Sequence, residues 1–303
     1  MLSIIILVIL LAVLSDVFFT ADNLMNVLRQ VSMTAIISAG MTMVMLTGEI
    51  DISLGSAVGF TNVLWAKLMV DYGFSPVPGA MICFLLVICF GLINGFLVAK
   101  VKVPPLIATF AMMSILRGMV YVLTDAYPVY NVPQVVLDFA RDTVFGIVPI
   151  PVVIMAGVFA VAIFITSKTK FGRFIYAVGG NAEAAHISGI KVVNTKLYAF
   201  IICQCLTCLA AIILTGRIGA GQTTSGTGWE FEALIACVIG GVSFAGGKGK
   251  MLGALSGAVF VGILVNGMTL LRVNSYYQQI IKGVILVLAL VLDVITTKNR
   301  KKL

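Results

Sequence analysis

The chain has 303 residues, of which 60% are hydrophobic and only 11% charged, and its mean hydropathy is +1.12. Soluble domains carry about 25% charged residues, so this composition excludes a water-soluble fold. The formal net charge of +8 does not indicate a nucleic-acid partner, because the cations lie between apolar runs and near the C-terminus. We predict an all-α polytopic membrane protein, since lipid leaves helices as the structure for long apolar runs.

Ten apolar runs follow one another along the chain, and a helix of about 20 residues is enough to cross a bilayer. They lie at about 2–19, 27–46, 53–70, 79–100, 104–123, 148–166, 197–214, 231–245, 251–271 and 277–296. We therefore expect about ten transmembrane helices in one transmembrane domain over residues 1–303. The polar segments between the runs are too short for an ATPase or another soluble catalytic domain.

Glycines four residues apart recur inside these runs, at 55 and 59, at 91 and 95, and at 253 and 257. Such pairs allow two helices to approach closely. We attribute them to packing within one subunit rather than to a dimer interface.

Four basic clusters indicate which loops share a side of the membrane. They are KVK at 100–102, the segment 167–196, GGKGK at 246–250 and KNRKK at 298–302. Alternation of ten spans places all four on one side, and positive charge favours the cytoplasm, so both termini are expected there. The opposite loops, which contain few cations, are 71–78, 124–147, 215–230 and 272–276.

The segment LTGEIDISLGS, residues 46–56, places Glu49 and Asp51 between two apolar runs. Charges at membrane depth are costly, so these carboxylates face protein or water. Two interpretations are open: an interfacial turn in which Ser53 caps the next helix, or a group that lines or gates a solute path.

Further polar residues lie inside the runs: Asn62, Asn94, Gln204, Glu230, Glu232, Asn266 and Gln278. Amides and carboxylates suit hydrogen bonding to a neutral polyhydroxylated solute, and they also serve bonds between helices. Our candidates for pathway or gating residues are Glu49, Asp51, Ser53, Asn62, Asn94 and Asn266. The runs lack the spaced carboxylates and partnered cations typical of an ion relay, which argues against an ion-coupled transporter without excluding it.

Signatures of catalysis are missing from the sequence. It has no H-E-x-x-H and no G-x-S-x-G, and its one histidine, His186, excludes a His-rich metal site. The AGGKGK stretch at 245–250 lacks the spacing of a phosphate-binding loop. All six cysteines lie in apolar runs and are interpreted as small buried residues. We predict no catalytic residue, no metal site and no cofactor site in this chain.

The polar segment 167–196 contains a predicted short helix, NAEAAHISG. Asn181 is suited to cap it, Glu183 to occupy its first turn, and Gly189 to end it. A helix this short needs a surface to pack against. Three interpretations are open from the residues alone: a loop at the membrane surface, a docking site for a soluble subunit, or a substrate gate.

The order Glu183-Ala184-Ala185 followed by Gly189 resembles the coupling-loop motif by which permease subunits of bacterial ABC importers contact their ATPases. Four longer stretches widen the resemblance to monosaccharide-importer permeases of the ribose, xylose and galactose type, over about residues 20–296. They are LTGEIDISLGS, FGRFIYAVGGNAEAAHISGI, GTGWEFEALIACVIGGVSFAGGKGK and NSYYQQIIKGVILVLALVLD.

The resemblance implies a multi-pass subunit of the bacterial plasma (inner) membrane, without enzymatic activity, that moves a monosaccharide by alternating access. Its implied partners are a second permease copy or paralogue, a cytoplasmic ATP-binding subunit that holds ATP and Mg, an extracytoplasmic sugar-binding protein, and membrane lipid. The ATPase-coupling residues that it implies are Gly172, Arg173, Gly180, Asn181, Glu183, Ala184, Ala185 and Gly189.

A ribose-like pentose is the favoured solute, but three departures from the family pattern leave the sugar open. They are Glu49 where many relatives have glycine, His186 where arginine is usual, and WEFEA at 229–233. The alternatives are a hexose, a nucleoside or a furanose signal. A stand-alone secondary transporter and an intramembrane enzyme remain as rivals of a different class.

Overall fold

The computed structural model describes the backbone of residues 2–300 and the side chains of 4–293 and 295. The predicted basic cluster at 298–302 lies outside the described side chains. Within the described residues the secondary-structure elements are α1 (Leu2–Leu14), α2 (Ala21–Leu46), α3 (Leu54–Val70), α4 (Pro76–Phe96), the π-helical turn η1 (Leu97–Val101), α5 (Pro105–Thr124), α6 (Gln134–Arg141), β1 (Thr143–Val144), β2 (Val148–Pro149), α7 (Ile150–Lys168), α8 (Lys170–Gly180), α9 (Ala182–Ile187), α10 (Val192–Ile218), α11 (Trp229–Ile239), α12 (Met251–Leu270) and α13 (Ser275–Arg300).

The predicted helical membrane fold is confirmed, except that one short two-stranded hairpin, β1–β2, accompanies the helices. Among the described residues, seven helices are long and apolar enough to cross a membrane: α2, α4 with η1, α5, α7, α10, α12 and α13. The other three predicted runs form shorter helices, α1, α3 and α11. With a rise of about 1.5 Å per residue, the 11 residues of α11 reach only about half of a 30 Å hydrocarbon core.

Prolines and glycines mark several helix ends. Proline occupies the first turn of α4, α5 and α7, where its missing N–H is not needed. Gly219, with φ of +77°, ends α10 in the left-handed conformation that glycine adopts without strain. These signals place the helix boundaries close to the edges of the apolar runs.

Helices α2 and α10 form the centre of the bundle. In the most apolar 18-residue stretch of α2, 83% of the residues are buried. The corresponding share for α13 is 6%, which places α13 at the periphery. A Cβ on Gly40 of α2 would lie 2.9 Å from Cys203 Cα, and one on Gly91 of α4 would lie 2.8 Å from Ile201 Cα. Both glycines therefore allow α10 to approach closely, and the predicted role of such glycines in packing within one subunit is confirmed.

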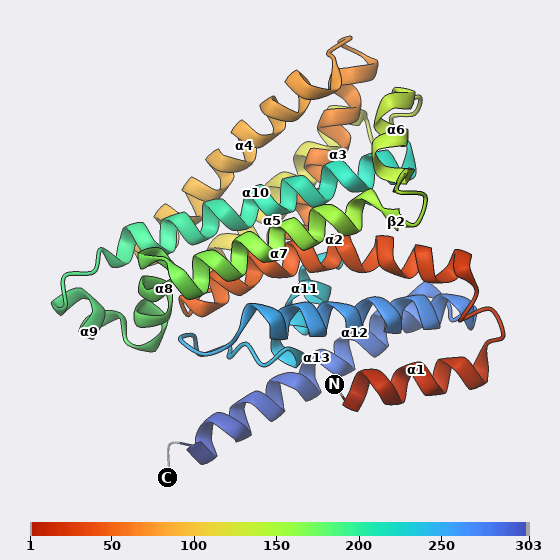
Figure 1. Ribbon diagram of the computed structural model, residues 1–303. Helices are drawn as coiled ribbons and strands as arrows, with labels where there is room; N and C mark the ends of the chain where they lie inside the picture. Colours follow the sequence, from red (N-terminus) through yellow and green to blue (C-terminus); the bar gives the residue numbers. More distant parts are fainter. Residues whose placement is uncertain (1, 301–303) are drawn as a thin grey trace.

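The two ends of the bundle differ. Figure 1 shows α8 and α9 protruding at one end, on the left, and α6 with the β1–β2 hairpin at the other. The hairpin pairs Thr143 with Pro149 and Val144 with Val148. Near it, Val129 forms an isolated bridge with Gly221, which joins the 124–147 loop to the connection between α10 and α11. These two segments were predicted to share a side of the membrane.

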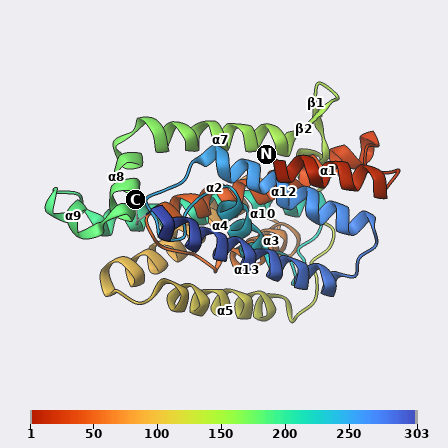
Figure 2. The same ribbon diagram turned by 90° about the horizontal axis from the view of Figure 1, so that it is seen from below.

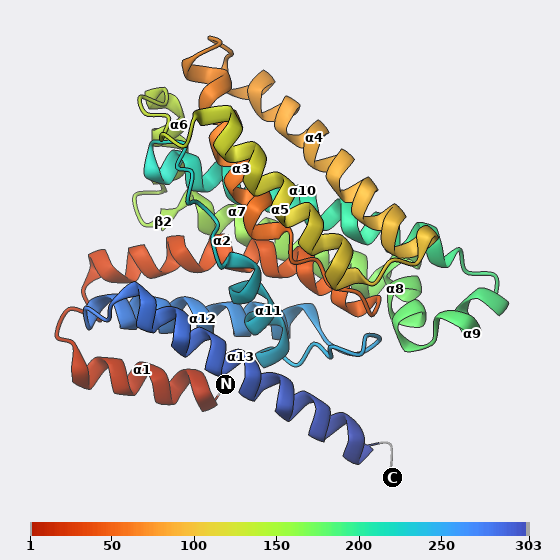
Figure 3. The ribbon, with the colours of Figure 1, turned by 180° about the vertical axis from the view of Figure 1, so that it is seen from behind.

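One long face of the bundle holds both α5 and α13 (Figure 2). Viewed from behind, the short helix α11 lies between α5 and α13, and the connection from α10 leads into it (Figure 3). The irregular segments on either side of α11, residues 219–228 and 240–250, follow from its shortness. Irregular backbone at membrane depth is stable only where it is buried in protein or borders water.

Candidate coupling segment and solute path

The predicted short helix and its caps are confirmed as α9. The Asn181 side-chain oxygen accepts hydrogen bonds from the backbone N–H groups of Glu183 and Ala184, both at 3.0 Å. Gly189 follows with φ of +83°. The polar segment 167–196 thus contains two short helices, α8 and α9, held by local hydrogen bonds at one end of the bundle (Figure 1).

The predicted coupling residues divide into two groups. Gly172 and Ala185 are buried and attach the segment to the bundle. The exposed group comprises Arg173, Gly180, Asn181, Glu183, Ala184 and Gly189. Beside them Ile187 is 81% exposed, so the tip of the segment presents an apolar side chain among charged ones. Such a mixed surface can bind another protein, but the role of these residues stays a prediction.

The end of α8 touches two other loops through glycine backbone. The Gly247 N–H donates to the Leu46 carbonyl at 3.0 Å. A Cβ on Gly179 would lie 2.5 Å from Gly247 N and closer still to the Leu46 carbonyl oxygen. We call this contact of residues 46–48, 179–180 and 246–249 the glycine junction. It joins the coupling segment to the loop after α2 and to the loop before α12.

One side chain secures the glycine junction. The Tyr176 hydroxyl on α8 donates to the Gly249 carbonyl at 2.9 Å. Burial raises the pKa of this phenol above its ordinary value, so the hydroxyl stays protonated and remains a donor. Tyr176 therefore fixes α8 to the 246–249 loop independently of the glycine contacts.

Glu49, a predicted pathway residue, forms an ion pair with Lys196 in the first turns of α10. The glutamate residue is 8% exposed, so its charge is largely removed from water and neutralised by the lysine. The pair connects the loop after α2 to the helix that directly follows the coupling segment.

Three predicted pathway residues meet in one hydrogen-bond network with a fourth side chain, Gln204. Asp51, which is 0% exposed, accepts from the Ser53 N–H at 2.9 Å and from Gln204 Nε2 at 2.9 Å. Asn94 Nδ2 and Gln204 Nε2 both donate to Ser53 Oγ, at 3.1 and 2.9 Å. Asn94 Oδ1 and Gln204 Oε1 are buried with no hydrogen-bond partner among the described residues. The network joins the 47–53 loop to α4 and α10.

The two remaining pathway candidates lie in contacts between segments. Asn62 Nδ2 donates to Thr215 Oγ1 at 2.8 Å, and Asn62 Oδ1 accepts from the Gln222 N–H at 2.7 Å. Asn266 Nδ2 donates to Asn23 Oδ1 at 2.8 Å, and the reverse bond measures 3.2 Å. The structure therefore does not bring these two asparagines to the Asp51 network. Whether they also line a solute path stays a prediction.

A cavity that the candidate residues did not include opens beside α5. Its volume is about 430 Å³, and Ser56, Ser114, Arg117, Tyr121, Thr227 and Glu230 are among its lining residues. Arg117 Nη1 donates to the carbonyls of Thr223 and Ser225, at 2.9 and 3.1 Å, and so holds the irregular segment before α11. A lone cation in the middle of the 104–123 apolar run is the sequence signal that could have identified Arg117.

Residues 23–290 match a family described as branched-chain amino acid transport system / permease component. The chain belongs to this permease family. The permease is similar to the ribose import permease protein RbsC of Escherichia coli (strain K12), with 40% identity over 302 residues, 97% of this chain and 92% of that protein. For the ribose import permease protein RbsC of Bacillus subtilis (strain 168) the identity is 39% over 298 residues, 96% of this chain and 91% of that protein.

The D-allose transport system permease protein AlsC of Escherichia coli (strain K12) is 36% identical over 284 residues, 93% of this chain and 86% of that protein. No solved structure matches the chain. The predicted resemblance to ABC sugar permeases is confirmed by these relatives. The permease is a transport component rather than an enzyme, and it is a multi-pass protein of the bacterial inner membrane.

Proposed function

We propose that the permease translocates a monosaccharide, with a ribose-like pentose as the favoured solute, as the membrane subunit of an ATP-driven importer. The observation that carries the proposal is the 40% identity to a ribose import permease over nearly the whole of both chains. The D-allose relative keeps other monosaccharides as alternatives that the same assay must include.

The proposed topology has ten crossings, made by the seven long helices together with α1, α3 and α11, in one transmembrane domain. Both termini lie in the cytoplasm. The clustering of 46–49, 167–196 and 246–250 at one end of the bundle supports this arrangement, because two of these segments are rich in cations. The end with α6 and the β1–β2 hairpin then faces outward.

The proposed partner at the cytoplasmic end is an ATPase subunit, which holds ATP and Mg, while this chain binds no cofactor. It contacts the exposed coupling residues on α8 and α9, among them Arg173, Glu183 and Gly189. An extracytoplasmic sugar-binding protein delivers solute to the opposite end, and a second copy or paralogue of the permease, surrounded by lipid, completes the pathway.

The proposed gate is at the cytoplasmic end of the solute path, in the loop that carries Glu49, Asp51 and Ser53. The glycine junction supports this, since it joins the coupling segment directly to that loop. Asn94 takes part through its bond to Ser53, and Asn62 and Asn266 hold neighbouring segments in register. A shift of α8 on ATP binding would therefore move the loop of residues 47–53. The Asp51 network would transmit this movement to α4 and α10.

The test is uptake of labelled ribose, xylose, galactose and D-allose by vesicles that contain the permease, with and without its ATPase and binding protein. We expect uptake that needs both partners and ATP, with ribose preferred. ATP-independent uptake by this chain alone contradicts the proposal and identifies a secondary transporter.

The coupling role has its own test. Glu183→Lys and Gly189→Pro should abolish uptake and co-purification of the ATPase, with membrane insertion unchanged. Normal uptake and co-purification in both variants contradicts the coupling role.

A further inference from the structure

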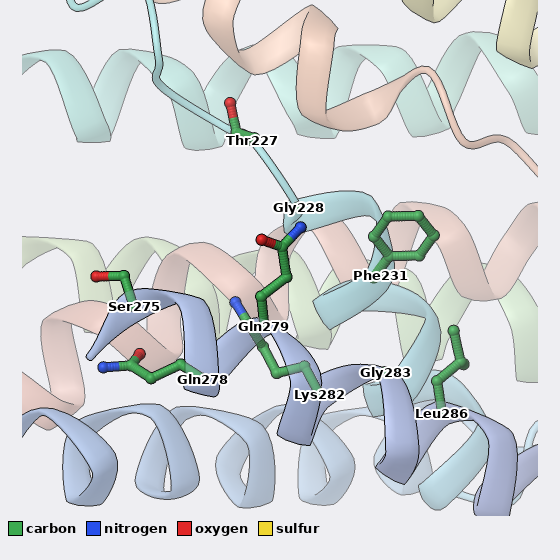
Figure 4. A pocket seen from close by; sticks show the side chains of 9 residues that line it. All are labelled: Thr227, Gly228, Phe231, Ser275, Gln278, Gln279, Lys282, Gly283 and Leu286. Carbon is green, nitrogen blue, oxygen red and sulfur yellow. The ribbon is translucent and has the colours of Figure 1, made fainter. Parts of the chain in front are cut away.

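A cavity of about 420 Å³ lies between the start of α11 and the first turns of α13. Figure 4 shows side chains from α13 reaching across it toward α11 and the segment that precedes it. The lining residues on which the argument depends are Thr227, Phe231, Ser275, Gln278, Gln279 and Lys282. Ligand sites for small molecules have volumes of about 300–1,000 Å³, so the cavity is large enough for a small solute.

The cavity extends into the membrane-spanning part of the protein. Lys282 lies seven residues after Ser275, which corresponds to a depth of about 10 Å along the α13 axis. Polar side chains at such depth face water or protein, because lipid leaves them without hydrogen bonds. Gln279 is exposed on a helix that is otherwise mostly apolar. Its surroundings in the working protein must therefore be aqueous or polar.

The hydrogen-bonding groups of the cavity are only partly used. Gln278 Nε2 donates to the Val273 carbonyl at 2.9 Å, which leaves the Gln278 side-chain oxygen as an acceptor. Thr227 Oγ1 donates its proton to the Thr224 carbonyl at 2.8 Å and keeps its lone pairs. The Gln279 amide, which supplies both donors and an acceptor, extends toward Gly228 (Figure 4).

The charge of the cavity is balanced. Lys282 Nζ donates to Glu232 Oε1 at 2.9 Å, so the one cation among the named lining residues is paired with a carboxylate of α11. A balanced pair does not favour an anionic solute such as a phosphate ester. The other two protons of the ammonium group can still donate to neutral oxygens.

One wall of the cavity is aromatic. The Phe231 side chain is 45% exposed and lies on the α11 side of the opening (Figure 4). A sugar ring has hydroxyl groups at its edge and C–H groups on its faces. An aromatic face beside amide and hydroxyl groups matches both parts, because it removes the C–H surface from water while the polar groups bond the hydroxyls.

We propose that this cavity is a contact site for a neutral monosaccharide, in which Gln279 bonds the sugar hydroxyls and Phe231 packs on the ring. This inference rests on the proposed function. The first turns of α13, which line the site, lie on the side of the bundle away from α9 (Figure 3), the side on which solute would enter in the proposed topology. It adds to the selectivity set by a binding protein, because only a solute with correctly placed hydroxyls can replace the water that it displaces from the Gln279 amide.

The first experiment measures uptake by the complete importer at saturating sugar-loaded binding protein. We expect Gln279→Leu and Phe231→Ala each to lower the maximal rate about three- to tenfold, the loss expected for one hydrogen bond or one packing contact. Gln279→Asn should recover part of the rate. Ile280→Ala is the matched control, since Ile280 is 60% exposed and is not among the residues that line the cavity.

A second measurement does not depend on transport. In the assembled complex, Gln279→Cys is labelled by a membrane-impermeant maleimide. Millimolar ribose should slow this labelling severalfold, whereas a sugar-free buffer of equal osmolarity should not. Ile280→Cys should show no protection. Absence of uptake by the wild-type importer with every sugar contradicts the proposed function. Normal wild-type uptake, together with unchanged rates in both variants and no protection of Gln279→Cys, overturns the contact site alone.

Discussion

Gly179→Ala tests whether the glycine junction transmits movement from the coupling segment. The added Cβ would lie 2.5 Å from Gly247 N, and real Cβ contacts under 3.0 Å are essentially never seen. Ordinary contact begins at 3.4 Å, so relief of the Gly247 contact alone requires a shift of about 0.9 Å, and the shorter contact with the Leu46 carbonyl oxygen requires a larger one. Gly247 N and the Leu46 carbonyl oxygen are backbone atoms joined by their own hydrogen bond, so neither can rotate away from the added Cβ.

The free energy of this change has two opposing contributions. Overpacking costs about 1–3 kcal/mol. Replacing glycine by alanine in a helix stabilises the folded protein by up to about 1 kcal/mol. The net loss of about 0–3 kcal/mol is too small to unfold a membrane bundle, but it is enough to displace α8 from the junction. We expect sugar uptake to fall at least fivefold while the purified variant keeps the wild-type unfolding temperature within a few degrees.

Gly157→Ala in α7 is the matched control, because a Cβ on Gly157 meets nothing within 4 Å, its φ is not positive, and it lies outside the glycine junction and the coupling segment. The assay is the number of sugars imported per ATP hydrolysed in reconstituted vesicles. We expect Gly179→Ala to hydrolyse ATP with little import, and Gly157→Ala to match the wild type. Equal ratios in the two variants would refute the reasoning that the junction carries the movement.

Three further predictions concern buried polar contacts. Asp51→Ala should lower the free energy of unfolding by more than about 2 kcal/mol, since buried donors that lose their acceptor cost about 1–3 kcal/mol each; an unchanged thermal unfolding midpoint in detergent contradicts this. Lys196→Met should destabilise the protein by about 1.5–3 kcal/mol by leaving Glu49 unpaired, and the double variant with Glu49→Gln should recover most of the loss in the same unfolding assay. Arg117→Ala should release the irregular segment 222–227 and speed its backbone hydrogen exchange at least tenfold; unchanged exchange there shows that other contacts hold the segment.

Features with a local cause could be predicted from the sequence. The α9 helix follows from the cap at Asn181 and the left-handed glycine at Gly189, and both signals act within eight residues of each other. The apolar runs likewise became helices, because in lipid the backbone of each run must bond within itself. Element type therefore depended on residues close in the chain.

Features that depend on tertiary contacts could not be predicted in the same way. Nothing near Asp51 in the sequence indicates that Gln204 on α10 will donate to it. Asn62 and Asn266, like Asn94, are asparagines inside apolar runs, yet the fold places them in contacts with other segments. A polar residue inside an apolar run predicts a partner, but the partner is set by which helices pack together.

The short helix α11 is where the coupling segment and the cavities of the permease come together. Its C-terminal end leads through residues 240–245 into the 246–249 loop, which Tyr176 and the glycine junction hold against α8. Its N-terminal end borders the cavity that contains Gln279, and a second cavity of about 490 Å³ lies between its C-terminal end and the Asp293 region of α13. Both flanks of α11 are irregular, so a shift of this helix would deform the flanks rather than break helical hydrogen bonds. The proposed alternating access therefore predicts that a displacement of α8 that reached α11 would change the cavities at both of its ends.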